Sequence, residues 1–224
     1  MMDIGAQEHV ATRGTIGILG AGRVGTAIAR LAVAAGYRVK IATSKPAADN
    51  ALIIEIVTPG AEAVDAAEAA ESDLVVVAVP LHKYKGVSAD ALAGRVVIDA
   101  MNYWSVTDGD IADFEADDRT SSEVVAAHLS ASRVVKSFNH IGYHEMEPDA
   151  AAPGAADRRA LAVAGDDGAA KDRVAEFIDA LGFDAVDAGG LAAGARFEPG
   201  TEIFNGRFNA AELAGLLQRS LAGI

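Results

Sequence analysis

The stretch TIGILGAGRVGTAIA, residues 15–29, decides the fold. Its apolar start at residues 15–20 predicts a buried strand, and residues 23–35 have the period of a helix. Between them, Gly20, Gly22 and Gly25 form the pattern G-x-G-x-x-G. In this pattern the first glycine allows a tight turn, the second lets the backbone approach a pyrophosphate, and the third lets helix and strand pack closely. The stretch therefore predicts a dinucleotide site, with the phosphates at the helix N-terminus.

Apolar, β-branched runs recur along the next hundred residues, and helical segments separate them. Because these runs do not alternate with polar residues, they are typical of strands that are covered on both faces of a parallel sheet. Residues 46–57 are expected to be helical, although LIIEIV at 52–57 would also suit a strand. TSSE at 120–123 has the spacing of a helix capping box. The expected strands lie at residues 37–42, 61–64, 74–79, 95–100 and 133–139.

The chain changes in character after residue 140. Residues 143–159 form a connection rich in Ala and Pro, and a strand, a helix, a strand and a final helix are expected at 160–167, 168–181, 183–189 and 202–221. The fold class is therefore α/β, a Rossmann-type, doubly wound, mainly parallel sheet with a smaller C-terminal α/β extension. We expect a flexible tail at residues 1–14, a nucleotide-binding domain at 15–140 and a smaller region at 141–224.

Composition excludes several function classes. The formal net charge of −13 argues against a nucleic-acid binder, whose affinity depends on Lys and Arg that neutralise phosphates. The absence of cysteine excludes disulfides, a thiolate nucleophile and a thiolate metal site. No apolar run is long enough for a membrane span, and residues 1–14 lack the features of a signal peptide. We expect a cytoplasmic protein that binds neither nucleic acid nor membrane.

The residues after the second expected strand indicate which dinucleotide binds. Thr43, Ser44 and Lys45 stand where an acid often holds the ribose hydroxyls of NAD. Their hydroxyls and positive charge instead suit the extra phosphate of NADP(H), and Arg23 could reach the same region. In a second interpretation, Ser44 caps the next helix, with Pro46 in its first turn. The two interpretations are compatible, because a capping turn also exposes amide donors.

The chain from Thr15 to about Leu217 resembles the NADPH-dependent reductases of the deazaflavin coenzyme F420, whose fold also occurs in the cytoplasmic domain of STEAP metalloreductases. The segments that carry the resemblance are GILGAGRVGTAIA, TSK, DLVVVAVP, GRVVIDAMN, RVVKSFN, VAGDD and DAGGL. It implies a pyrophosphate held by the backbone of Arg23 and Val24. It also implies a 2′-phosphate held by Thr43, Ser44 and Lys45. The residues implied to line the nicotinamide end are Val79, Pro80, Leu81, Ala100, Met101, Asn102 and Asn139.

The resemblance further implies the reaction. It is a hydride transfer between NADPH and a small-molecule, flavin-like redox acceptor, with coenzyme F420 or a flavin as second substrate, in a homodimer that pairs through its C-terminal region. Because the cofactors carry this chemistry, no side chain need be an essential acid or base. A flavin or ferric reductase of the same fold, and an NADP-binding sensor without turnover, are the alternatives.

The aromatic pair Tyr103 and Trp104 departs from the family, which commonly has Asn-Pro in this segment. These rings suit a wall for a flat acceptor, and they equally suit plain packing. Any catalytic residue remains unknown. His82, Asn139 and His140 are candidates, and either histidine could assist proton delivery. A histidine at a strand end is more often a polar rim residue. His140 and His144 are spaced as a pair of metal ligands would be, but no third ligand is evident, and we expect no metal.

Overall fold

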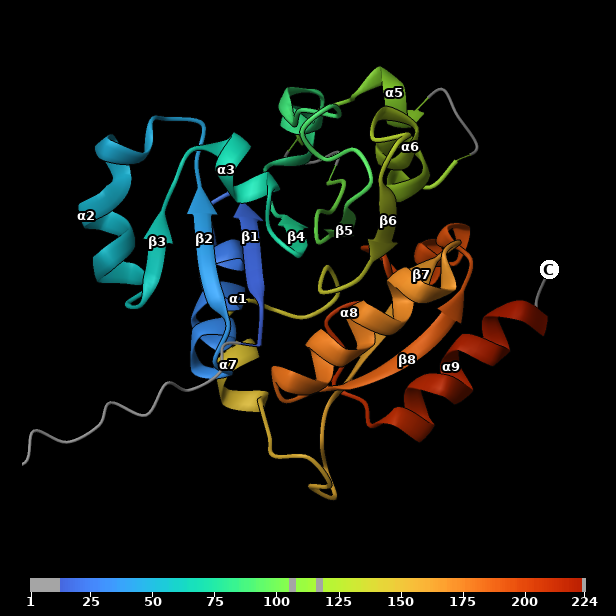
Figure 1. Cartoon of the computed structure of the whole chain (residues 1–224). Helices are drawn as coiled ribbons and strands as arrows, with labels where there is room; N and C mark the ends of the chain where they lie inside the picture. The colour runs from blue at the N-terminus through green and yellow to red at the C-terminus, as the bar shows by residue number, and fades with distance from the viewer. Residues whose placement is uncertain (1–12, 105–107, 116–118, 223–224) are drawn as a thin grey trace, which may run out of the picture.

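The computed structural model describes residues 13–104, 108–115 and 119–222. An eight-stranded sheet of order β3-β2-β1-β4-β5-β6-β7-β8 runs through it (Figure 1). Neighbouring strands are parallel except β6 and β7. The Rossmann-type α/β class is therefore confirmed, and the last two strands extend the same sheet. Most of the expected tail lies outside the described residues, and the three-part domain division stays a prediction.

The N-terminal part follows the expected alternation of strand and helix. LIIEIV lies in a helix, so its interpretation as a strand is wrong. The elements are β1 (Thr15–Leu19), α1 (Arg23–Ala34), β2 (Arg38–Ala42), α2 (Ala47–Val57), β3 (Ala61–Ala63), α3 (Ala66–Ala70) and β4 (Leu74–Val77). They continue with the 3₁₀ helix η1 (Leu81–Gly86), β5 (Val96–Asp99), α5 (Ala112–Glu115), α6 (Ser121–His128) and β6 (Arg133–Lys136). The capping box that opens α6 is confirmed, with Thr120 and Glu123 bonded reciprocally.

The final helix begins later than expected. The C-terminal elements are α7 (Met146–Asp149), β7 (Ala160–Gly165), α8 (Gly168–Ala180), β8 (Asp184–Gly189), the 3₁₀ helix η2 (Leu191–Phe197) and α9 (Ala210–Ala222). The expected start at residue 202 is wrong because Asn205 adopts a positive φ of 60°, which interrupts a helix. Asn209 and Glu212 then bond to each other's backbone N–H at 3.0 Å each, which starts α9 here.

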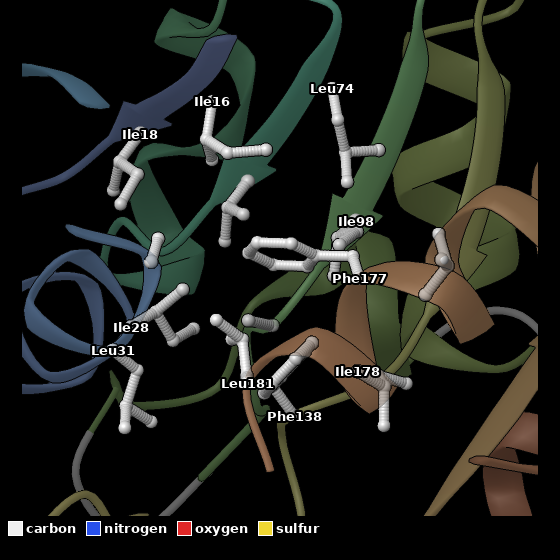
Figure 2. Packing of buried hydrophobic residues seen from close by; sticks show 14 of the residues in the cluster. Ile16, Ile18, Ile28, Leu31, Leu74, Ile98, Phe138, Phe177, Ile178 and Leu181 are labelled. Carbon is white, nitrogen blue, oxygen red and sulfur yellow. The ribbon is translucent and has the colours of Figure 1, made fainter. Parts of the chain in front are cut away.

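Three hydrophobic clusters pack against the sheet. One contains α1 and α8, another contains α3, η1 and α6, and a third contains η2 and α9 against β7. Figure 2 shows part of the first cluster: the ring of Phe177 from α8 lies between Ile28 of α1 and the strand residue Ile98. Because five neighbouring parallel strands, β2, β1, β4, β5 and β6, point the same way, their carboxyl ends form one edge. In open α/β sheets ligands bind along this edge.

None of the helices in the described part of the chain combines the length and apolar content that a membrane span requires.

Candidate functional site

The loop between β1 and α1 contains three glycines, and the physical reason for glycine differs between the positions. Gly20 has a φ of 114°, and a Cβ on Gly25 would lie 1.9 Å from the carbonyl oxygen of Gly20. Both positions therefore need glycine for the fold itself. A Cβ on Gly22 would contact no protein atom within 4 Å. The fold itself does not require glycine there, and the open space leaves room for the close approach of a ligand.

The N-terminus of α1 is open to an anion. Its N-cap Gly22 makes no side-chain cap, and its first turn holds no acidic residue. The first N–H groups and the helix dipole therefore favour negative charge at this point. The Arg23 guanidinium lies 5.3 Å from the ring centroid of Tyr143 and bonds to its hydroxyl at 3.3 Å. This side chain thus contacts the segment after β6, not the turn after β2.

The turn after β2 is held by Thr43. Its hydroxyl oxygen accepts the backbone N–H of Lys45 at 3.0 Å and the Asn50 amide at 2.8 Å. Helix α2 starts behind Pro46 without a side-chain cap, so the interpretation of Ser44 as its cap is wrong. In the described part of the chain, neither the Ser44 hydroxyl nor the Lys45 ammonium makes a hydrogen bond or ion pair. These two groups are the ones available to a ligand.

A cavity of about 470 Å³ opens at the ends of β1 and β2. This volume falls within the range of small-molecule sites, roughly 300–1,000 Å³. Gly20, Thr43, Ser44 and Val79 line it, together with apolar residues of α3 and of the segment after η1. Lys83 of η1 also lines it, and sequence reasoning missed this residue because no motif marks the η1 turn. The cavity joins the glycine loop to the turn that Thr43 holds.

A buried ion pair supports the turn at residues 100–102. Asp99 and Lys136 are register partners on β5 and β6, both side chains are fully buried, and Nζ lies 3.2 Å from the Asp99 carboxylate. Lys136 also donates to the Met101 carbonyl at 2.6 Å, and Asp99 accepts the Met101 N–H at 3.0 Å. Ser122 donates to Asp99 at 2.6 Å. Sequence reasoning missed the pair, although a carboxylate and an amine at the ends of two successive apolar strands were the available signal.

A hydrogen-bond chain orients the two asparagines that the family resemblance places at the nicotinamide end. The backbone N–H of Ala162 donates to Nε2 of His140 at 3.0 Å, so the proton of the neutral ring is on Nδ1. Nδ1 then donates to the Asn139 side-chain oxygen at 3.2 Å. The Asn139 amide in turn donates to the Asn102 oxygen at 3.1 Å and to the Phe197 carbonyl at 3.0 Å. The side-chain oxygen of Asn139 and both hydrogens of its amide are therefore used in hydrogen bonds.

Asn102 ends this chain, and its second amide N–H has no partner among the residues that the structure describes. Its amide nitrogen donates to the Asn139 carbonyl at 2.7 Å, and its side chain is half-buried. Phe138, just before Asn139, has a φ of 64°, a conformation that is strained for an aromatic residue and that turns the chain at the end of β6. Burial, reinforced by the positive charges of Arg159 and Lys136, lowers the pKa of His140 to about 3. The ring is thus a neutral, fixed support, which does not suit the proton delivery considered for it.

Comparison with known proteins gives the family. Residues 15–103 match the model of the family described as NADP oxidoreductase, coenzyme F420-dependent. Over these residues the chain is similar to this NADP oxidoreductase family. It is 30% identical over 187 residues to metalloreductase STEAP3 of Rattus norvegicus, an alignment that covers 82% of the chain and 35% of that relative. The chain thus spans about a third of the curated relative that it matches.

Two solved structures are similar to the chain over most of their length. A hypothetical protein of Sinorhizobium meliloti is 28% identical with a TM-score of 0.75, over 87% of this chain and 95% of that one. A protein of Arthrobacter sp. FB24, named as a candidate F420-dependent NADP reductase, is 25% identical with a TM-score of 0.67, over 81% and 88%. The matched family and this solved structure therefore both carry the description of an NADP oxidoreductase.

The remaining predicted residues differ in how far they are exposed. Leu81, Ala100 and Met101 are buried, whereas Pro80 is exposed. His82 is half-exposed, with Nδ1 3.6 Å from the Asp108 carboxylate. His144 is exposed while His140 is buried, and no group of three or more metal-ligating side chains gathers anywhere in the described residues.

The two rings that depart from the family pattern have different environments. Tyr103 stacks on Phe114 at 5.2 Å, and its hydroxyl bonds to Glu115 at 2.6 Å, which is packing within its own segment. The Glu115 hydrogen bond raises the pKa of the Tyr103 phenol. Trp104 is 44% exposed and makes an edge contact with Phe204 at 5.4 Å. Of the pair, Trp104 is the ring that could meet a ligand.

Proposed function

We propose that the chain transfers a hydride between NADP(H) and a flavin-like acceptor, the deazaflavin coenzyme F420. The observation that carries the dinucleotide half is Gly22, whose Cβ position is free of protein atoms in front of an uncapped helix N-terminus. The family description carries the acceptor half. The bound cofactors supply the hydride chemistry, and the protein sets the distance and the face of the two rings.

In this proposal the N–H groups of Arg23 and Val24 bind the pyrophosphate. The Ser44 hydroxyl and the Lys45 ammonium bind the 2′-phosphate, and Thr43 holds the turn that presents them. A local cation matters here because the chain has a net charge of −13, which disfavours an anionic ligand at long range. A charge-assisted bond to phosphate is roughly twice as strong as a neutral one.

The nicotinamide end would lie against residues 79–81, residues 100–102 and Asn139. Asn102 would offer its free N–H, held in place through Asn139 and His140. Asn139 would act through Asn102, since its own amide is already bonded. Trp104 would give an aromatic face to the flat acceptor ring. No acid or base is required of the protein, which agrees with the neutral, enclosed state of His140.

The test is turnover with defined acceptors. Purified protein with NADPH and oxidised F420 should bleach the visible band of F420 as NADPH is consumed in equal amount. The 30% identity to a metalloreductase favours a second candidate, an NADPH-dependent flavin or ferric reductase. Reduction of FMN, FAD or ferric iron without reduction of F420 would support that candidate. NADPH binding without turnover of any acceptor would support a sensor.

The 2′-phosphate assignment has its own test. Lys45→Ala should weaken NADPH binding and leave NADH binding nearly unchanged, since NADH lacks the phosphate that Lys45 would meet. Equal weakening of both cofactors would contradict the assignment. Homodimerisation through the C-terminal region is also a proposal, and the mass in solution, measured by light scattering, tests it.

A further inference from the structure

We propose that Lys83 is a second 2′-phosphate ligand, which lines the cavity together with Thr43 and Ser44 and makes the chain specific for NADP(H). This inference rests on the NADP(H) site proposed above and adds a residue from a different element. Lys45 follows β2, whereas Lys83 belongs to η1, which follows β4. The cofactor preference would then depend on two separate parts of the fold.

The cavity at the ends of β1 and β2 brings Lys83 to the turn that Thr43 holds. Thr43, Ser44 and Lys83 all line it. No Asp or Glu is among the residues that line it, so no carboxylate within the cavity competes with a bound phosphate for the lysine. Two acids of the neighbouring α3 region are engaged elsewhere, because Glu68 pairs with Lys40 and Asp65 accepts the N–H of Ala47.

The ion pairs of the lysines point to the same cavity. The chain has six lysines, and all of them lie in the described residues. Four form ion pairs: Lys40 with Glu68 at 2.8 Å, Lys85 with Asp113 at 2.5 Å, Lys136 with Asp99 at 3.2 Å and Lys171 with Asp187 at 2.8 Å. Among the residues that the structure describes, Lys45 and Lys83 have no such partner.

This pattern is informative because acids outnumber bases. With 32 Asp and Glu against 19 Lys and Arg, an ion-pair partner is easy to find on this surface. Lys83 lines the cavity, and Lys45 directly follows Thr43 and Ser44, which also line it, so a doubly charged phosphate there would be the common partner of the two lysines. A second cation at the site would also raise the local potential for an anion, and this effect acts over the screening length of about 10 Å at 0.1 M salt.

The two lysines of η1 have different environments. The ammonium of Lys85 is bound by Asp113 and lies 5.7 Å from the ring centroid of Tyr84. Lys83 lines the cavity, and no ion pair or ring contact links it to any residue that the structure describes. Lys85 is therefore a matched control, since it has the same residue type and lies in the same short helix but does not line the cavity.

The experiment measures dissociation constants by calorimetry for NADPH and NADH, and for adenosine 2′,5′-bisphosphate and AMP as probes of the adenosine half. We expect Lys83→Ala to weaken NADPH and the bisphosphate about fivefold to tenfold, where tenfold is 1.4 kcal/mol, and to change NADH and AMP less than about twofold. Lys85→Ala should change none of the four, and Lys83→Arg should keep the preference. Lys45→Ala with Lys83→Ala should remove it.

Three outcomes would overturn the inference, and they differ in what else they affect. If wild-type protein prefers NADPH and Lys45→Ala removes the preference while Lys83→Ala does not, the role of Lys83 fails and the NADP(H) site stands. The same holds if Lys83→Ala weakens NADPH and NADH equally. If the wild-type protein binds NADPH no better than NADH, both this inference and the proposed cofactor fail.

Discussion

Mild acid should destabilise the protein through His140. The ring is buried, its Nε2 accepts the Ala162 N–H, and its pKa is lowered to about 3 from an ordinary value of 6.5. The His140 ring therefore binds a proton near pH 6.5 in the unfolded chain but only near pH 3 in the folded chain. Stability that is present above pH 6.5 is lost as the pH falls through this window.

The size of the effect depends on how far the pH of the solution lies below the ordinary pKa of histidine. Each pKa unit corresponds to about 1.36 kcal/mol, so at about pH 5 the loss from this one ring is about 2 kcal/mol. The Arg30 hydrogen bond lowers the pKa of Glu147 from 4.5, and the Lys85 hydrogen bond lowers that of Asp113 from 3.8. Stability from such acids is lost only below their ordinary pKa values. They therefore contribute little between about pH 6.5 and pH 5.

Urea denaturation at about pH 7.5 and pH 5 measures this loss. His140→Gln removes the titrating ring, so the variant should be less stable at pH 7.5 but should lose about 2 kcal/mol less than wild type on acidification. The exposed His144 provides the control, and His144→Gln should keep the wild-type pH dependence. Equal losses in wild type and His140→Gln would refute the reasoning, because they would place the proton uptake elsewhere.

Three further results are expected. Gly22→Ala should weaken NADPH binding and leave the unfolding midpoint unchanged, whereas Gly25→Ala should lower the midpoint, because its Cβ would lie 1.9 Å from a backbone oxygen. Asp99→Ala should cost about 3–5 kcal/mol in urea denaturation by leaving Lys136 buried without its partner, and adding Lys136→Met should recover part of the loss. Trp104→Ala should raise the KM for the acceptor at unchanged NADPH affinity, and an unchanged KM would exclude a direct contact.

Local pattern accounts for the elements and for the glycine loop. Apolar runs without alternation identified the parallel strands, and G-x-G-x-x-G between a strand and a helix located the α1 N-terminus. The start of α9 was missed because residues 202–209 have a helical period but do not form a helix. The positive φ of Asn205 interrupts them, and the reciprocal hydrogen bonds of Asn209 and Glu212 start the helix later. Such a boundary depends on single hydrogen bonds, which periodicity does not report.

Residue types and their order along the chain were enough to identify the α/β class, the dinucleotide loop and the turn with Thr43, Ser44 and Lys45. Only the tertiary structure decided which of these side chains are available. Thr43 is used within its own turn, and Lys83 lines a cavity with Ser44, from which it is 39 residues distant in sequence. Likewise, strand register brings Asp99 to Lys136, and burial makes His140 a fixed neutral support. The physical reason is that pairing, burial and pKa depend on neighbours in space, which a linear pattern does not specify.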